Sequence, residues 1–437
     1  MLGYYLDMAL HSLVRNKVLT ALMVLAIGLG IGASMTMITV LHVLTGDPLP
    51  GRSSQLFTPH LDPLPLNYKQ RGDSPDPADN FTWPDAMALL KAHPAKRQAA
   101  MAGGNLLVRP ARAGLRPFKV DGRYATADFF AMFDVPFEHG HGWSTADDAA
   151  RAHVVVLSET LDRKLFGSDR GVGQMVRLGD HDFRVIGVIT DWQPKPMFYA
   201  DPGAQHYSDA DQFFLPLSVA MDLELSINGH KSLWDKDDDS DSLTSANMTW
   251  LQFWVQLDSP AQAQVYRQFL VDYSAQQKAL GRFERPPTDA KLYSLMGWLA
   301  HENLVPNDVR LQMWLALGFL FVCMVNIVAL LLAKFLRRSG EISVRRALGA
   351  RRWDIFLQLG IESALIGVAG GVLGLVIAQI GLWSVRRRPD DYAQMAQMDM
   401  PMLLGTLALA IVASVLAGLL PAWRACRVPP ALQLKTQ

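Results

Sequence analysis

A short basic segment contains the residues whose types and spacing most clearly suggest a task. Residues 337–353 hold six arginines and one acid, Glu341, between two long apolar runs. Positive charge beside an apolar span resists translocation, so the segment is predicted to be a loop on the cytoplasmic side of a membrane. Arginines of this kind also bind anionic lipid headgroups, and fixing the topology in this way would by itself explain them.

The residue order inside this loop predicts a short helix. Ser339 is of a type that caps a helix start, Glu341 falls in the first turn, where the helix dipole favours an anion, and Gly349 stands where a left-handed residue ends a helix. A helix of two or three turns is marginal in water by itself. We therefore expect it to dock on a partner surface, which Ile342, Val344, Ala347 and Leu348 could contact.

Other residue groups that suggest metal or catalytic chemistry are incomplete. His139 and His141 could share a metal on one face of a strand, but no third ligand has a suitable spacing. The acid cluster at 235–241 lacks the calcium-loop pattern, because Ser242 stands where glycine is needed and Met248 where glutamate is needed. We find no HExxH, GxSxG, P-loop or dinucleotide motif. The sequence thus predicts no catalytic residue, no metal site and no cofactor, with any ATPase on a separate subunit.

Composition divides the 437 residues between lipid and water. Half of them (50%) are hydrophobic and the mean hydropathy is +0.11, yet 19% are charged, too many for a chain immersed wholly in lipid. The formal net charge is zero, with an acidic excess in the long middle region, so no nucleic-acid partner is predicted. Cys323 and Cys426 fall outside that region and provide no disulfide framework for it.

Four apolar runs predict membrane spans around one large external domain. Residues 18–44 are too long for a signal-peptide core and no convincing cleavage site follows, so we expect them to remain as the first span, with the N-terminus inside. Residues 1–17 place leucines at helical spacing and predict an amphipathic helix on the inner membrane surface. The rest is predicted to divide into a domain at 45–310, spans at 311–335, 355–385 and 401–423, a cytoplasmic loop at 336–354, an outer loop at 386–400 and a cytoplasmic tail at 424–437.

Three consecutive arginines, 386–388, oppose this topology because they fall on the outer side. Asp390, Asp391 and Asp399 neutralise that loop, although acidic residues count weakly in the charge rule. The inner arginines, together with the basic pair before the first span, outnumber the outer ones.

Small and polar residues inside the spans suggest how the helices pack. Small residues four apart let two helices approach closely. The pairs are Gly28 with Gly32 in the first span, Gly367 with Gly371, overlapping Gly370 with Gly374, in the third, and Ser414 with Gly418 in the fourth. Asn326 and Glu362 are polar residues within spans and are functional candidates by default. Glu362 lies about two turns from the inner face, where it could snorkel, bond to another helix or relay protons.

The sequence between the first two spans predicts an α/β domain. Residues 152–192, called the legible stretch below, give the clearest signals of secondary structure. A buried strand ends at Leu157, Ser158 caps a helix, and Gly167 ends that helix. Two more strands, at 176–178 and 183–189, follow with a tight turn between them. A strand at 250–257 and a helix from Pro260 to Gln277 are expected in the other half of the domain.

Several stretches resemble the FtsX-like, MacB-type family of ABC transporter permeases. In the basic loop, the resemblance is carried by the order of arginines, Glu341-Ile342, Arg345-Arg346, Ala-Leu-Gly-Ala and more arginines. In the outer domain it is carried by VVLSETL, LFG, VGQ and FRVIGV, in that order between residues 155 and 188. Near the two ends it is carried by LVRNK at 13–17 and by the proline-bounded segment 421–429.

The resemblance implies an α+β membrane protein with four transmembrane helices and a large α/β periplasmic domain inserted between helices 1 and 2. That domain would be a MacB-like core with an inserted subdomain at about 195–250. The basic loop would contain the coupling helix that meets the ATPase subunit. The residues that match this helix are Glu341, Ile342, Arg345, Arg346, Leu348, Gly349 and Ala350.

The resemblance further implies a dimeric, non-catalytic permease of an ABC exporter in the bacterial inner membrane, with both termini cytoplasmic. Its partners would be a cytosolic ABC ATPase subunit, a second permease copy or a paralogue, membrane lipids, and often a periplasmic adaptor and an outer-membrane channel. In this family ATPase motion passes through the helices to the outer domain, which moves substrate on the periplasmic side. Two alternatives remain open, an FtsX-like signalling relay controlling a periplasmic partner and a lipoprotein-releasing permease.

Overall fold

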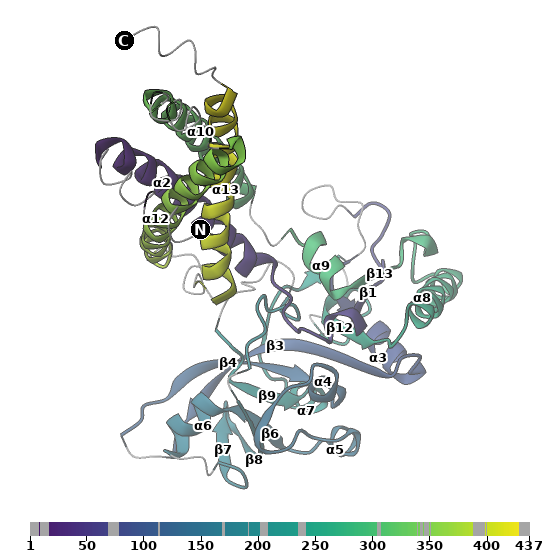
Figure 1. The fold of residues 1–437 in the computed structure, drawn as a ribbon. Coiled ribbons are helices and arrows are strands. Elements are labelled where there is room, and N and C mark those ends of the chain that lie inside the picture. The colour runs from purple at the N-terminus through teal and green to yellow at the C-terminus, as the bar shows by residue number, and fades with distance from the viewer. Residues whose placement is uncertain are drawn as a thin grey trace. The chain divides into compact units, whose positions relative to one another are not determined.

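The chain folds into two units, which the computed structural model in Figure 1 presents as a helical unit and an α/β unit. The helical unit comprises Met1–Thr45 and Val305–Gln437, and the α/β unit comprises Gly46–Leu304. The residues that the structure describes are 8, 17–68, 78–111, 114–167, 171–190, 192–201, 209–234, 242–303, 307–338, 340, 344, 349, 351–387, 398 and 400–427. The predicted N-terminal helix, apart from Met8 and Lys17, and the acid cluster at 235–241 lie outside them.

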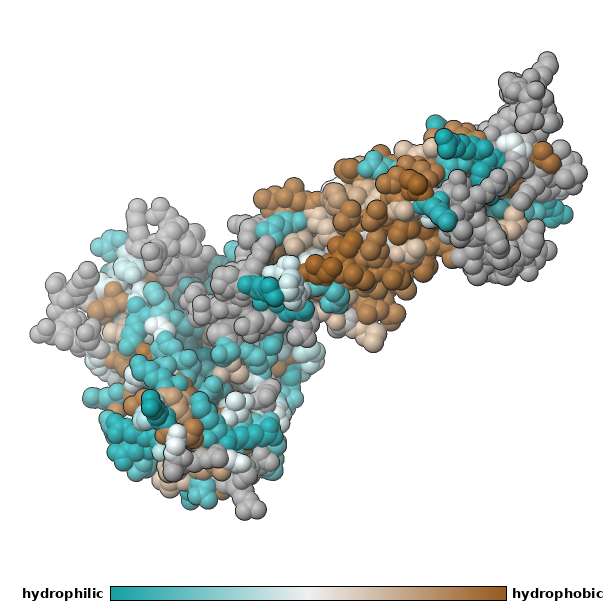
Figure 2. All heavy atoms as spheres, turned by 90° about the vertical axis from the view of Figure 1, so that its left-hand side faces the viewer, coloured by the Kyte–Doolittle hydropathy of each residue, from teal (hydrophilic) through white to brown (hydrophobic). Residues whose placement is uncertain are grey.

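Four helices of the described part are long and apolar enough to cross a membrane. They are α2 (Lys17–Thr45), α10 (Asn307–Arg337), α12 (Arg352–Val385) and α13 (Met400–Arg427). The α/β unit lies between the first and second of them in the chain, which confirms the predicted fold class. In Figure 2 apolar side chains cover much of the helical unit, whereas polar ones prevail on the face of the α/β unit in view.

The four helices pack in a ring. Helix α12 packs along α2 and α13, and α10 packs along the same two helices. Their shared core is built from aliphatic and small side chains, among them Ile27, Ile31, Leu331, Ile366 and Ala410. In the described part, α10 and α12 therefore occupy opposite positions of the ring and share no extensive contact.

The α/β unit is organised around one mixed sheet in the order β13-β1-β12-β3-β4-β9-β6-β8-β5. Short strands β2 and β11 pair with β12, β10 pairs with β3, and β7 pairs with β3 and β8. The strands are β1 (Leu56–His60), β2 (Phe81–Thr82), β3 (Arg97–Arg109), β4 (Phe118–Ala125), β5 (Phe137–Gly140), β6 (Val154–Ser158), β7 (Met175–Leu178), β8 (His181–Ile189), β9 (Phe213–Pro216), β10 (Ile227–Asn228), β11 (Ser232–Leu233), β12 (Met248–Gln256) and β13 (Lys291–Ser294).

Helices and loops cover both faces of this sheet, so the central strand β12 is buried along its whole length. The helices are α3 (Trp83–Ala92), α4 (Asp128–Met132), α5 (Thr145–Ala150), α6 (Glu159–Phe166), α7 (Leu217–Asp222), α8 (Pro260–Ala279) and α9 (Leu295–His301), with short 3-10 turns η1 (Ser53–Gln55) and η2 (Pro287–Asp289). Alternation along β12 sends Phe253 and Val255 into the core under α3 and α8, and Trp254 into the core under α4 and α9.

The legible stretch folds as its sequence predicts. The Ser158 side chain accepts a hydrogen bond from the Leu161 amide and caps α6, and Gly167 ends the helix with a left-handed φ of +76°. Strands β7 and β8 follow as an antiparallel pair, with Gly179 in the turn at a φ of +62°. These elements were predictable because their signals are local.

The segment 195–250, where the sequence predicts an inserted subdomain, contributes a strand to the main sheet. Its strand β9 lies between β4 and β6, parallel to the first and antiparallel to the second. Its helix α7 and strand β10 likewise pack on or pair with the main sheet. The four apolar residues of β9 are buried, so the segment supplies a core strand.

Candidate functional site

The basic loop connects α10 to α12, and three of its central residues are described. Gly340 and Val344 are exposed, and Gly349 has a backbone φ of +101°, in the left-handed region that favours glycine. A left-handed glycine thus stands where the sequence predicts the loop helix to end. The other residues matched to the coupling helix, which are Glu341, Ile342, Arg345, Arg346, Leu348 and Ala350, lie outside the described residues.

The first turn of α12 positions the C-terminal end of this loop. Asp354 lies in that turn, where the helix dipole favours an acid, and its amide donates to the Arg351 carbonyl at 3.1 Å. Trp353 is 65% exposed and stacks on Phe356, with ring centroids 5.6 Å apart. An exposed indole beside a cluster of arginines is suited to a membrane interface or a partner surface.

Glu362 on α12 lies inside the helical bundle with two cations, Lys334 of α10 and Arg338, which directly follows α10. Its Oε1 is 2.6 Å from Lys334 Nζ and its Oε2 is 3.4 Å from Arg338 Nη1. The side chains of Glu362 and Lys334 are only 1% exposed, and that of Arg338 is 21% exposed. The carboxylate therefore bonds to another helix, one of the three roles considered from the sequence, and snorkelling to solvent is wrong for it.

Ser363, the residue of α12 that follows Glu362, contacts α13. The Ser414 hydroxyl donates to the Ser363 carbonyl, and a Cβ on Gly418 would collide with the Ser363 side chain. Ser414 and Gly418, the predicted packing pair of the fourth span, therefore face α12 directly beside Glu362.

The glycines of α12 face two different neighbours. A Cβ on Gly367 would lie 2.8 Å from Ser414 Cβ, and one on Gly371 would lie 2.9 Å from Ala410 Cβ, so this pair faces α13. A Cβ on Gly370 would lie 2.5 Å from Ile27 Cγ2, so the overlapping pair faces α2. The sequence predicted both pairs but could not assign each to its neighbour.

Glycines of α2 complete the second of these contacts. A Cβ on Gly28 would lie 2.8 Å from Leu373 Cγ, and one on Gly32 would lie 2.6 Å from Ile377 Cγ2 and 3.0 Å from the Gly374 carbonyl oxygen. Both helices thus present a small-residue face to each other, which lets their backbones approach closely.

The structure does not bring Asn326 to this site, because its side chain is exposed on the outer face of α10. Sequence reasoning missed Lys334 and Arg338 as the partners of Glu362. The available signal was Lys334 itself, a cation inside the last turn of an apolar run that holds no acid of its own.

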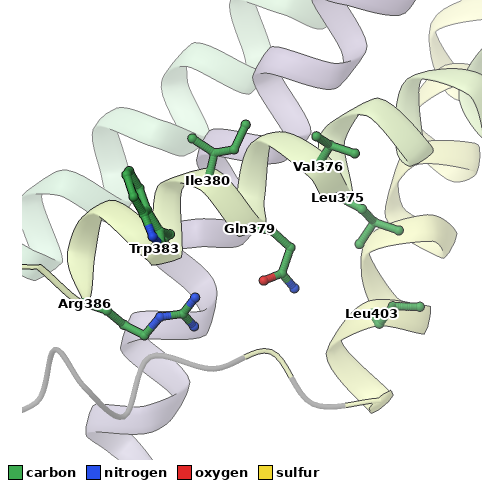
Figure 3. Close-up of a pocket in the computed structure, with 7 residues that line it drawn as sticks. All are labelled: Leu375, Val376, Gln379, Ile380, Trp383, Arg386 and Leu403. Carbon is green, nitrogen blue, oxygen red and sulfur yellow. The ribbon is translucent and has the colours of Figure 1, made fainter.

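An open groove lies at the other end of α12 (Figure 3). Leu375, Val376, Ile380 and Trp383 of α12 form its wall with Leu403 of α13, and its volume is about 630 Å³. Gln379 and Arg386 are its polar members, and the neighbouring Arg387 guanidinium lies 3.8 Å from the centre of the Trp383 ring. Apolar walls that end in a tryptophan and arginines are typical of a membrane interface.

Within the described residues of both units, no three histidine, cysteine, aspartate or glutamate side chains form a group that could hold a metal ion. His139 lies in the edge strand β5, and His141 Nδ1 lies 2.7 Å from the Gly142 carbonyl oxygen just beyond it. Among the described residues of the helical unit, Glu362 and Lys334 form an ion pair in which both side chains are 1% exposed.

Two family profiles match the chain. The profile described as MacB-like periplasmic core domain matches residues 20–270, more than half of the chain, and that described as FtsX-like permease C-terminal matches residues 313–430. The first covers most of the α/β unit, and the second covers α10, α12, α13 and the basic loop between them.

Curated relatives agree with these matches. The chain is 26% identical over 430 residues to a protein of Pseudomonas entomophila named pyoverdine export ATP-binding/permease protein PvdT, covering 97% of this chain and 58% of that protein. It is 28% identical over 239 residues to a macrolide export ATP-binding/permease protein MacB of Bdellovibrio bacteriovorus, covering 54% and 32%. The aligned part of the chain thus spans little more than half the length of the first relative and about a third of the second.

Among solved structures, the periplasmic region of MacB from Actinobacillus actinomycetemcomitans aligns with 56% of this chain and 92% of its own length, at 15% identity and a TM-score of 0.37.

Proposed function

Because the chain belongs to the family of ABC transporter permeases that combine a MacB-like periplasmic core domain with an FtsX-like C-terminal region, we propose that it is the membrane subunit of an ABC exporter. In this proposal a cytosolic ATPase binds the basic loop between α10 and α12. Its motion passes along the helices to the α/β unit, which acts on substrate outside the membrane.

One observation carries the proposal. The arginine-rich loop joins two spans whose chain continues, through α10, directly into the water-soluble unit. Residues flanking α10 at its C-terminal end are basic, and Gly349 has the backbone conformation expected at the end of a short docking helix. A movement imposed on this loop is therefore applied to a helix that leads to the external unit.

The names of the two relatives support export over a signalling relay, since both are named for exporting a compound. We infer that the substrate is handled on the outer side of the membrane by the α/β unit. An adaptor protein, an outer-membrane channel and a second permease copy or paralogue complete the proposed assembly, and lipid acyl chains occupy the apolar groove of Figure 3.

The orientation in this proposal places both termini and the basic loop inside and the α/β unit outside. Single cysteines at Val344, in the loop, and at Val265, exposed on α8, test it in a background without Cys323 and Cys426. An impermeant maleimide added to intact spheroplasts should label only Val265→Cys, and both positions after lysis. Labelling of both positions in intact spheroplasts would refute the proposed transmission across the bilayer.

ATPase binding tests the coupling role. A tagged chain purified from native membranes should retain an ABC ATPase subunit, identified by mass spectrometry, and ATP hydrolysis in the eluate. Replacing Glu341 and Leu348 with alanine should release most of that subunit, because these residues lie in the proposed docking helix. Arg387→Ala, a basic residue of the opposite loop, is the matched control and should retain it. Undiminished retention by the double variant would remove the coupling assignment.

A further inference from the structure

Helices α10 and α12 carry the two ends of the basic loop, yet they lie opposite each other in the four-helix ring. Each packs along α2 and α13, whereas in the described part of the chain they share no extensive backbone contact. Packing alone would let each move with its neighbours and independently of the other. Any direct link between them must cross the interior of the bundle.

The ion cluster at Glu362 is such a link. Lys334 extends from α10 and Arg338 from the residue that follows it, and Glu362 extends from α12 to meet them at 2.6 Å and 3.4 Å. Two polar contacts between other pairs of spans join neighbours in the ring. Ser34 bonds to the Ala316 carbonyl, from α2 to α10, and Ser414 bonds to the Ser363 carbonyl, from α13 to α12.

The burial of this cluster makes it selective for one arrangement of the helices. With both partners 1% exposed, neither Lys334 nor Glu362 can exchange its partner for bulk water without the helices moving apart. A buried charge that loses its counter-charge is strongly destabilising, because its desolvation is no longer compensated. Buried ion pairs of this kind are best supported as devices that specify a particular arrangement.

The position of the cluster along the helices places it close to the loop. Lys334 lies three residues before the end of α10, while Glu362 lies ten residues after the start of α12, or about 15 Å along the helix axis. The first turns of α12, with Trp353 and Phe356, thus extend from the cluster to the loop. A displacement of these turns acts first on the Glu362 contact.

We propose that Glu362 is a positioning residue that braces α12 against α10 across the bundle interior, through Lys334 and Arg338, so that the basic loop and both helices move as one body. The proposal rests on the coupling function proposed above, for which the brace would transmit displacement of the loop to α10 and on to the external unit. It assigns Glu362 no proton-carrying role.

A distance measurement on the chain alone tests the brace without the ATPase. Spin labels at Leu336 on α10 and Leu357 on α12, both exposed, report the separation of the two helices in lipid nanodiscs, in a background without native cysteines. The parent should give one narrow distance distribution. Glu362→Gln removes the charge but not the volume and should reduce the population at that distance at least about tenfold.

Charge reversal distinguishes a brace from a general need for glutamate at this position. The double variant Lys334→Glu with Glu362→Lys restores opposite charges across the bundle and places the new acid four residues before Arg338, a favourable spacing on one helix. It should recover the narrow distribution that Glu362→Gln loses. A proton carrier would not be rescued by this exchange, so failure of the folded double variant to recover would overturn the proposal.

Two further variants keep the result interpretable. Gln379→Leu changes an exposed polar residue of the same helix and should leave the distance unchanged. If Glu362→Gln does not fold, Lys334→Met with Glu362→Leu removes both deeply buried charges and leaves only Arg338 of the cluster, whose side chain is 21% exposed, so it should fold with a broadened distribution. A parent-like distribution in either folded variant at Glu362 would refute the brace.

The effect of the brace on function is tested by measuring ATP hydrolysis of the purified complex with its ATPase subunit. Glu362→Gln should retain the subunit, since the docking helix is untouched, but should lose most substrate-dependent or lipid-dependent stimulation of ATP hydrolysis, and the charge exchange should restore it. If the parent chain retains no ATPase subunit, the proposed function fails while the distance measurement still decides the brace.

Discussion

The interiors of the two units are packed with side chains of opposite size. The α/β unit buries large aromatic rings, with Phe129, Phe133, Tyr199 and Trp254 packed in one cluster. The helical unit buries glycines, whose missing side chains are replaced by Leu373, Ile377 and Ile27 of neighbouring helices. In water, burial of apolar area drives folding, whereas in lipid close backbone approach must supply the attraction. The α/β unit should therefore be most sensitive to the loss of side-chain volume, and the helical unit to added side-chain volume.

Buried charges differ between the units in a related way. In the α/β unit, Arg123 pairs with Asp211 at 2.8 Å within one region of the sheet and also donates to the Tyr199 carbonyl at 3.2 Å. In the helical unit, Lys334 and Glu362 join helices that otherwise hardly meet. The Arg123–Asp211 pair joins elements that core packing already positions. The Lys334–Glu362 pair fixes the position of α10 relative to α12.

The largest expected effect is from Trp254→Ala in the α/β unit. Trp254 is 2% exposed and lies edge-on to Phe133 and Phe198. Its loss leaves a cavity that a rigid sheet fills poorly, so the opening free energy of β3 and β12 should fall by about 3–5 kcal/mol. Hydrogen exchange of the full chain in detergent measures this strand by strand. Unchanged protection of these strands would contradict the central role of aromatic packing.

Enlarging a glycine in the helical unit should be the next largest effect. Gly32→Leu would force its side chain against Ile377 and the Gly374 carbonyl, separating α2 from α12 at a cost of about 1–3 kcal/mol. Cys323 of α10, buried against Gly30 of α2, reports the displacement of α2 through its rate of thiol labelling in a Cys426→Ala background. We expect labelling to accelerate about 5- to 150-fold.

Gly318→Leu on α10 is the matched control, because no atom outside its chain neighbours and its own helix backbone lies within 4 Å of the position of its Cβ. Labelling of Cys323 in this variant should stay within about twofold of the parent, the range of ordinary surface substitutions. Equal acceleration by both leucines would show that added volume anywhere in the spans is disruptive, and would remove the distinction between packed and open glycines.

Local signals explain most of what the sequence could predict. Ser158 and Gly167 define α6 through interactions within the helix itself. A long apolar run in the sequence indicates each span. The predicted family and fold class follow from such signals and are confirmed. The place of β9 in the main sheet could not be predicted, because its pairing with β4 joins Tyr124 to Leu215 and no local pattern encodes a contact over that separation.

The candidate site shows the same limit. Glu362 could be singled out because a carboxylate in an apolar run is rare, but its partner could not, since either the lipid interface or any other helix could have satisfied it. The glycine pairs of α12 could likewise be recognised from their spacing in the sequence. Their assignment to α2 or α13 depends on the rotation of the helix, which only tertiary packing sets.

A smaller effect with a defined sign is expected from Asp148 in the α/β unit. Burial raises the pKa of this carboxyl to about 6 from 3.8, although its Oδ2 accepts a hydrogen bond from the Ala127 amide at 2.8 Å. The folded unit thus holds a proton that the unfolded chain has already lost. Its contribution to stability should fall as pH rises from about 4 to 6 and then level off.

Asp148→Asn should therefore stabilise the α/β unit at pH 7, relative to the parent, by about 1 kcal/mol more than at pH 5. Hydrogen exchange of β4 and α4 at the two pH values, corrected for intrinsic rates, measures the difference. Asp147→Asn is the control. Hydrogen bonds from Ser144 lower the pKa of Asp147, so its titration lies below this window and the parent's slope between pH 5 and 7 should persist. An unchanged slope in Asp148→Asn would exclude this carboxyl as the source.

The smallest effect should come from an ion pair that is not buried. Lys96 Nζ lies 2.9 Å from Asp258 Oδ2, but the two side chains are 48% and 39% exposed, so water and salt screen the attraction. Lys96→Met keeps the aliphatic stem and should lower the opening free energy of the adjoining strands β3 and β12 by at most about 1 kcal/mol, with the difference shrinking in high salt. Hydrogen exchange at low and high salt measures both. A loss as large as that of Trp254→Ala would mean that charge contributes to the α/β unit even where it remains hydrated. The contrast with Glu362 would then lie in the connection it makes and not in its burial.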